Sequence, residues 1–235
     1  MLVVDKKTFL LGTAMAVTFF IVLFLMFLPL FRGINAFEAS DRLFNSIAKG
    51  SSNYLADLRE KTDGYRGSAF TVNVELKTED MVLMAVSMLS KAGTESDRSG
   101  ARLTATGDLS RLAGAILEDS EAMFRNQGKE ISLKYGYPEK EVLFVWWSIL
   151  KEMRKAMESK RNFKTAAFLD DVMRRGVEVA YNFYGIEPKK ASANVGVLTG
   201  ALLFYILYTL WWGYAILHLF NGFGLSMKAG AKKEV

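Results

Sequence analysis

The sequence predicts a mainly α-helical membrane protein, in which two transmembrane helices flank an extracytoplasmic, mostly helical domain with a small β element. Two uncharged stretches favour this fold class: 24 residues from Thr8 to Phe31, and 37 residues from Ala191 to Met227. A helix needs about 20 apolar residues to cross a bilayer, and both stretches are longer than that. The third observation is that the basic excess of the chain gathers beside these stretches.

The formal net charge of +5 indicates the orientation of the chain rather than a nucleic-acid partner. Residues 33–194 hold 24 basic and 23 acidic side chains, so the middle of the chain is almost neutral. Short basic flanks stay in the cytoplasm, whereas long domains are translocated largely regardless of their charge. We therefore expect both termini in the cytoplasm and the middle outside the plasma (inner) membrane. The excess basic residues are Lys6, Lys7, Arg32, Lys228, Lys232 and Lys233.

The first helix is expected to remain as an uncleaved anchor, because its apolar run exceeds the roughly 7–15 residues of a signal-peptide core. Bulky Ile34 also occupies the −3 place of the candidate cleavage site. The chain has no cysteine, which excludes disulfides and thiolate-bound metal centres within it. The predicted parts are a cytoplasmic tail (1–7), a first transmembrane helix (8–32), the extracytoplasmic domain (33–194), a second transmembrane helix (195–220) and a cytoplasmic tail (221–235).

The first half of the outer domain mixes helical and strand patterns. Helical spacing of apolar residues continues past the first span and predicts one helix out to about Lys61. The alternating stretch AFTVNVELKT, residues 69–78, predicts a strand. Thr78 followed by two acids indicates a helix N-terminus, because a hydroxyl and first-turn carboxylates satisfy free amide groups. That helix is expected to end near Ala92, and GTESDRSG, residues 93–100, is predicted to be a loop.

Residues 106–117 resemble residues 78–89 at an offset of 28 residues, sharing a Thr, an Asp, an Ala and most apolar positions. One interpretation is a duplicated strand–helix unit. The other is that capping and helical periodicity alone make two amphipathic helices alike.

The last third of the outer domain predicts a helical hairpin. Pro138 suits the start of a helix that runs to about Lys160. The second helix is expected from Phe163 to Tyr184, with Gly185 as its left-handed cap.

The stretch VLFVWWSIL, residues 142–150, is the most apolar part of the outer domain and is too short to span a membrane. Trp146 and Trp147 lie about 100° apart on a helix, so both are buried only if the helix is covered on more than one side. Residues 142–150 are therefore interpreted either as core or as a contact with a partner, and a neighbouring subunit could supply part of the cover.

Motifs for catalysis and metal binding are absent from the sequence. There is no G-x-x-x-x-G-K-[ST] and no G-x-S-x-G, and the outer domain has no histidine to serve as a base. The acids at 118, 119 and 121 lack a calcium-loop pattern, and Glu121 is spaced to pair with Arg125. The basic stretch 151–164 is interpreted either as solvated helix surface or as a face that contacts lipid head groups or an anionic partner. We expect neither an enzyme nor a cofactor.

The second span is unusually aromatic, with eight aromatic rings between residues 202 and 224. Phenol and indole donors need partners in hydrocarbon, so either the ring-bearing faces pack on protein, or the span is 193–213 and residues 214–224 lie along the interface. His218 as a metal or haem ligand would need a second ligand from a partner, or a quinone could bind beside it. Its place near the cytoplasmic interface favours an ordinary histidine. Phe204, Tyr208, Trp211 and His218 share one helical face, and Tyr205, Thr209 and Trp212 share a neighbouring one.

Small residues at i, i+4 let helix backbones approach closely, and both spans have such a pair. Gly196 and Gly200 lie near the outer end of the second span, and Gly12 and Ala16 lie near the inner end of the first. In antiparallel spans the two pairs lie at opposite depths, so either could serve another chain. The candidate partner-binding residues are Trp146, Trp147, Gly196, Gly200, Tyr205, Tyr208, Trp211, Trp212 and His218.

Three functions fit these observations. The first is a non-catalytic accessory subunit of a larger membrane complex, of transporter, channel or respiratory type, which contacts the lipid bilayer and another integral membrane protein. The second is an extracytoplasmic ligand-binding or sensing module that signals through a partner; the order of anchor, outer helical domain and anchor resembles the input half of a bacterial chemoreceptor. The third is a homo-oligomeric membrane scaffold.

Overall fold

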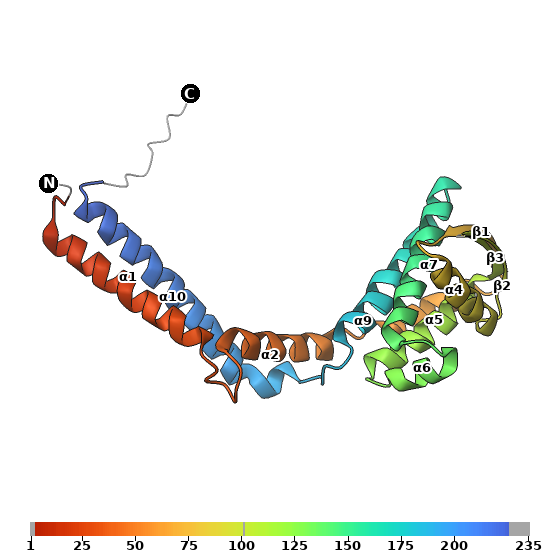
Figure 1. The fold of residues 1–235 in the computed structure, drawn as a ribbon, viewed down its shortest axis with the longest axis horizontal. Helices are drawn as coiled ribbons and strands as arrows, with labels where there is room; N and C mark the ends of the chain where they lie inside the picture. The colour runs from red at the N-terminus through yellow and green to blue at the C-terminus, as the bar shows by residue number, and fades with distance from the viewer. Residues whose placement is uncertain (1–2, 101, 226–235) are drawn as a thin grey trace, which may run out of the picture. The chain divides into compact units, whose positions relative to one another are not determined.

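The computed structural model describes residues 3–100 and 102–225 and is mostly helical, with one small sheet. The chain forms two compact units (Figure 1). The first, which we call the hairpin unit, consists of residues 1–47 and 189–235. The second, the central unit, consists of residues 48–188.

Two long apolar helices form the hairpin unit, and each is long and apolar enough to cross a membrane. They are α1 (Lys6–Phe27) and α10 (Val195–Gly222), the latter preceded by the 3-10 turn η2 (Ala191–Asn194). They lie side by side and antiparallel (Figure 1). Asp5 caps α1 by accepting hydrogen bonds from the amides of Lys7 and Thr8.

The predicted single helix from the first span to Lys61 is wrong, because the chain breaks twice before that residue. The helix α1 ends at Phe27, where Leu28 is extended (ψ 148°). Proline disfavours helical geometry in the residue before it and has no amide hydrogen, and Pro29 follows directly. The helices after the break are α2 (Ala36–Ser51) and, beyond a second break, α3 (Leu55–Asp63).

A three-stranded antiparallel sheet lies in the central unit, in the order β1-β3-β2. The strand predicted at residues 69–78 is confirmed as β1 (Ala69–Glu75). The loop predicted at residues 93–100 is wrong, because Glu95–Ser99 forms β2, an edge strand paired with β3 (Arg102–Asp108). The sequence ESDRS has no apolar alternation to signal a strand, and backbone pairing with β3 is what makes it one.

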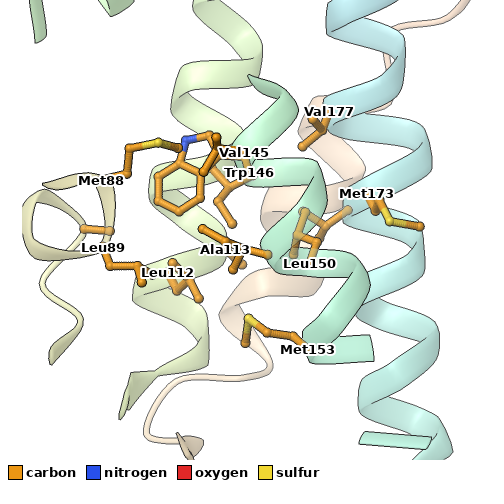
Figure 2. Close-up of a cluster of buried hydrophobic side chains, with 14 of the residues drawn as sticks. Met88, Leu89, Leu112, Ala113, Val145, Trp146, Leu150, Met153, Met173 and Val177 are labelled. Carbon is orange, nitrogen blue, oxygen red and sulfur yellow. The ribbon is translucent and has the colours of Figure 1, made fainter. Parts of the chain in front are cut away.

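The helices of the central unit pack around a single apolar core, part of which Figure 2 shows. The predicted helical hairpin is confirmed, and Gly185 adopts the left-handed conformation (φ 83°) expected of its cap. A short helix, α6, was not predicted. The helices are α4 (Glu79–Lys91), α5 (Leu109–Phe124), α6 (Gly128–Tyr135), α7 (Glu139–Ser159) and α8 (Phe163–Asp171), with α8 continued by the π-helix η1 (Val172–Glu178) and by α9 (Val179–Phe183).

The similarity between residues 78–89 and 106–117 extends to their buried faces but not to their caps. Thr78 caps α4 by accepting from the amide of Met81, as predicted. Its counterpart Thr106 lies within β3, and Asp108 caps α5 instead. Each helix also follows a strand, β1 before α4 and β3 before α5, so a duplicated strand–helix unit and two helices made alike by periodicity both account for the similarity.

Candidate functional site

Three of the aromatic residues predicted to bind a partner pack against α1 of the same chain and remain partly exposed. The Tyr208 hydroxyl donates to the carbonyl oxygen of Phe19 (3.2 Å), and the Trp211 indole donates to that of Met15 (3.1 Å). The Phe19 ring stacks on Tyr208, with centroids 4.1 Å apart, and packs against Trp212 at 4.6 Å. The Tyr208 hydroxyl and the Trp211 indole N–H therefore find their hydrogen-bond acceptors within the hairpin unit.

His218 and Gly12 lie at the other end of the same helix contact. A Cβ atom added to Gly12 would lie 2.7 Å from the backbone nitrogen of Leu219, so α1 reaches the α10 backbone there. The prediction that Gly12 contacts another chain is wrong, because α10 of the same chain packs against the Gly12 side of α1. The Nδ1 atom of His218 is buried and has no hydrogen-bond partner among the described residues.

The remaining predicted residues of α10 face open space. A Cβ atom added to Gly196 or Gly200 would meet nothing within 4 Å, as expected if these glycines do not meet Gly12. Tyr205 is 66% exposed, and its phenol has no hydrogen-bond partner within the described part of the chain. The Tyr205 side of α10 is therefore free for a contact outside the hairpin, whereas Gly200 lines an apolar hollow with residues of α1 and α2.

Trp146 belongs to the core, which is the first of the two interpretations given for residues 142–150. It is fully buried, and its indole donates to the Asp119 carboxylate at 2.8 Å. Tyr135 (2.7 Å) and Lys134 (2.8 Å) donate to the same carboxylate. Burial, and then the Asp119 charge, raise the pKa of the Tyr135 phenol far above its usual range. Asp119 thus serves as a structural acceptor, and the predicted Glu121–Arg125 ion pair forms two residues further on.

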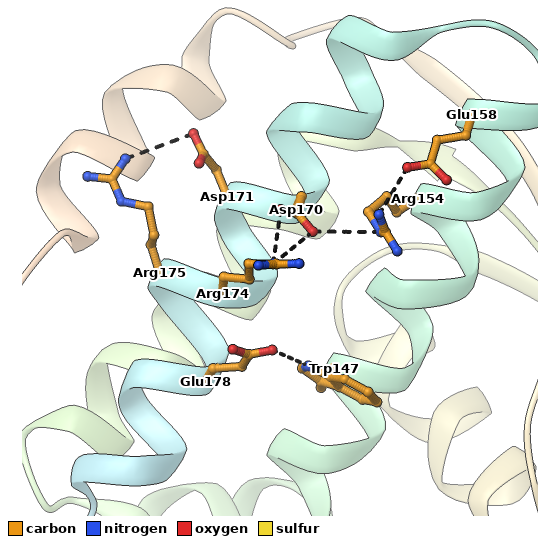
Figure 3. A network of polar contacts seen from close by, with 8 residues as sticks. All are labelled: Trp147, Arg154, Glu158, Asp170, Asp171, Arg174, Arg175 and Glu178. Carbon is orange, nitrogen blue, oxygen red and sulfur yellow. Dashed lines mark hydrogen bonds and ion pairs between the residues drawn. The ribbon is translucent and has the colours of Figure 1, made fainter. Parts of the chain in front are cut away.

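Trp147, in contrast, is only partly buried, and it packs at the edge of the core in a small apolar pocket between α7 and the η1–α9 segment. The indole donates to the Glu178 carboxylate at 2.7 Å, as Figure 3 shows. The ring of Phe144 stacks on that of Trp147. The pocket has a volume of about 160 Å³ and is lined by Leu143, Phe144, Trp147, Val177, Glu178, Tyr181 and Asn182.

The electrostatics of this pocket are those of an acid among aromatic rings. No ion pair of Glu178 is present among the described residues, whereas nearby Asp170 pairs with Arg154 and Arg174 (Figure 3). Lys151 lies over the Trp147 ring, with its ammonium nitrogen 4.8 Å from the centroid. Sequence reasoning missed Glu178, because no local pattern links it to Trp147. The π-helix η1 ends at Glu178, and π-helical turns are common at functional sites.

Within residues 3–100 and 102–225, no three His, Asp or Glu side chains gather as metal ligands would. Comparison with known proteins finds no protein-family model, no curated protein and no solved structure that matches this chain.

Proposed function

We propose that this protein is a non-catalytic accessory subunit of a larger membrane complex, of transporter, channel or respiratory type. In this proposal α1 and α10 cross the plasma (inner) membrane, both termini are cytoplasmic, and the central unit is extracytoplasmic. The lengths and apolar compositions of the two helices support the membrane placement. The positions of the basic residues support the orientation.

The exposed phenol of Tyr205 carries the proposal of a protein partner. Tyr205 lies within an uncharged 28-residue helix, and its hydroxyl has no partner within the described residues. An unpaired hydroxyl in hydrocarbon costs about 1–3 kcal/mol by the measure of protein mutations. A polar group on another membrane protein would remove that cost. The open face at Gly196 offers a second place where a helix backbone can approach closely.

The test is site-specific photocrosslinking in native membranes, followed by native mass spectrometry of the complex in mild detergent. A photoreactive residue at Tyr205 should crosslink to one distinct membrane protein. Leu207 is a matched control, because it is equally exposed (66%) on the same helix but faces another direction. A crosslink to a second copy of this chain would favour the scaffold function, and no crosslink at Tyr205 would count against a partner at this face.

A second candidate function, a ligand-binding or sensing module, is favoured by the Trp147–Glu178 pocket. The aromatic rings of this pocket attract cations, as Lys151 over Trp147 and Lys140 over Tyr181 show, and an organic cation would compete with these lysines. Glu178 supplies an anion without an ion-pair partner among the described residues. We propose a small organic cation as its ligand. Choline should raise the melting temperature of the full chain in detergent, and its neutral isostere 3,3-dimethylbutanol should not.

Matched variants separate binding at this pocket from a general salt effect. Glu178→Gln should abolish the choline-induced shift, and Glu130→Gln, a change at an exposed acid outside the pocket, should preserve it. An equal shift with choline and with the neutral isostere would contradict recognition of a cation.

A further inference from the structure

An apolar crevice lies in the hairpin unit between α1, α2 and α10. Its volume is about 640 Å³, and its walls are almost entirely hydrocarbon. The wall residues include Val22 and Met26 of α1, Leu43 of α2, and Val197 and Phe204 of α10. A crevice of this size holds one long acyl chain, and it lies at the Phe27 end of α1, where the proposed span meets the outer membrane surface.

A second hollow of about 290 Å³ adjoins the crevice and is basic. The two hollows share Phe31, Ala39 and Leu43, so hydrocarbon and charge meet at one place. The second hollow is lined by three cationic side chains, those of Arg32, Arg42 and Lys189.

Two of these three cations are available to a ligand. Arg42 pairs with Glu38 at 2.6 Å, one turn earlier on α2. Neither Arg32 nor Lys189 has an ion-pair partner among the described residues. The unpaired charge at this hollow is therefore positive.

Hydrogen bonds fix the backbone at or beside both Arg32 and Lys189. Arg32 has a φ of 55° in a tight turn, in which Phe31 and Ile34 exchange both backbone hydrogen bonds. Such a φ is uncommon for a side chain larger than that of glycine, and it is maintained only where the surroundings impose it. The amide of Lys189 donates to the carbonyl oxygen of Ser46 at 2.9 Å, which ties this residue to α2.

We infer that these adjoining hollows bind one anionic phospholipid, with one of its acyl chains in the apolar crevice and its phosphate between Arg32 and Lys189. The inference rests on the membrane placement proposed above, but not on the partner at Tyr205. Each basic residue near a membrane surface strengthens the attraction of an anionic lipid roughly fivefold. A zwitterionic lipid with the same chains fills the crevice but gains less from the two cations.

The test is native mass spectrometry of the full chain in mild detergent, with equal amounts of dioleoyl phosphatidylglycerol and dioleoyl phosphatidylcholine. We expect adducts of the anionic lipid to exceed those of the zwitterionic lipid by up to about 25-fold, because each of the two cations contributes roughly fivefold. Arg32→Asn combined with Lys189→Ala should bring this ratio close to one, and asparagine tolerates the left-handed turn that Arg32 adopts. Lys77→Ala combined with Lys129→Ala removes the same charge at exposed positions of the central unit and should leave the ratio unchanged.

The apolar crevice is tested by filling it. A Cβ at Gly200 meets nothing within 4 Å, so Gly200→Leu should fill the crevice without disturbing the fold and reduce adducts of both lipids equally. Gly213→Leu, also in open space but outside the crevice, is its control.

Three outcomes would overturn the inference. The first is an equal retention of both lipids by the unaltered chain. The second is a ratio that survives the loss of both Arg32 and Lys189. The third is displacement of the lipid by millimolar glycerol 3-phosphate, which would show that the basic hollow binds phosphate without acyl chains.

Extraction of the membranes with alkaline carbonate distinguishes a failure of the lipid site from a failure of the membrane placement. Release of the chain would reject the membrane placement and the lipid site together. Retention of the chain without lipid preference would reject the lipid site alone.

Discussion

Asp119 brings a carboxylate into the core of the central unit, where Tyr135, Trp146 and Lys134 donate to it. The buried phenol and indole keep their hydrogen bonds only while this acceptor is present. Asp119→Ala should therefore lower the free energy of unfolding by about 2–4 kcal/mol, because two buried donors lose their acceptor. The change is measured by thermal unfolding of the full chain in detergent. Glu118→Ala, at the exposed neighbouring acid, should stay within about 0.5 kcal/mol, and an equal loss in both variants would contradict a specific role for Asp119.

Glu139 links α6, α7 and the end of α9, because it accepts from the Ser132 hydroxyl (2.6 Å) and from the Tyr184 hydroxyl (3.0 Å). The bond from Ser132 is the main cause that lowers the pKa of Glu139 below its ordinary value of 4.5. A carboxyl group with a lowered pKa contributes stability above its unfolded pKa and loses it as the pH falls through the folded pKa.

Glu139→Gln should therefore reduce the loss of melting temperature between pH 6 and pH 3. The measurement is a series of thermal melts across that range. Glu141→Gln, which removes an exposed charge from the same first turn of α7, is the control. A pH dependence that is identical in the Glu139 variant and the unaltered chain would contradict this assignment.

At the scale of elements, Gly12 allows α1 and α10 to pack at backbone distance. Gly12→Leu should separate the two helices, because the added Cβ would lie 2.7 Å from the Leu219 nitrogen and 3.0 Å from the His218 carbonyl carbon. The chain lacks cysteine, so Phe9→Cys combined with Phe223→Cys reports the contact through a short bismaleimide crosslinker, since the native rings are 5.0 Å apart. The crosslinking rate should fall in Gly12→Leu and remain unchanged in Gly213→Leu. A normal rate in both would show that the helices tolerate the side chain.

The helices and strands also show which structural features local sequence patterns are sufficient to predict. Caps and stop signals act within a few residues, so Thr78 and Gly185 were predicted correctly. The strand β2 and the π-helix η1 were not predicted. The pairing of β2 with β3 is visible only in three dimensions, and the seven residues of η1 have the composition of an ordinary amphipathic helix.

At the scale of the whole molecule, the proposed topology places Lys7 and Leu133 on opposite sides of the membrane. Single cysteines introduced at these positions into the cysteine-free chain test it with a membrane-impermeant maleimide in intact cells. Leu133→Cys should be labelled, because Leu133 is 86% exposed, and Lys7→Cys should be labelled only after the cells are opened. Labelling of Lys7→Cys in intact cells would reverse the topology.

The sequence by itself determined the two apolar helices, the helical hairpin of the central unit, the strand β1 and the caps at Thr78 and Gly185. Each of these depends on composition, periodicity or a few neighbouring residues, and such local signals can be read along the chain. Only the tertiary structure decided that Trp146 is core while Trp147 lies in a pocket beside Glu178. It also decided that Tyr208 and Trp211 donate to α1, and that Arg32 and Lys189 line one hollow. These pairings join residues 31 to 196 positions apart, and no local signal connects such residues, because the packing of the folded chain alone brings them together.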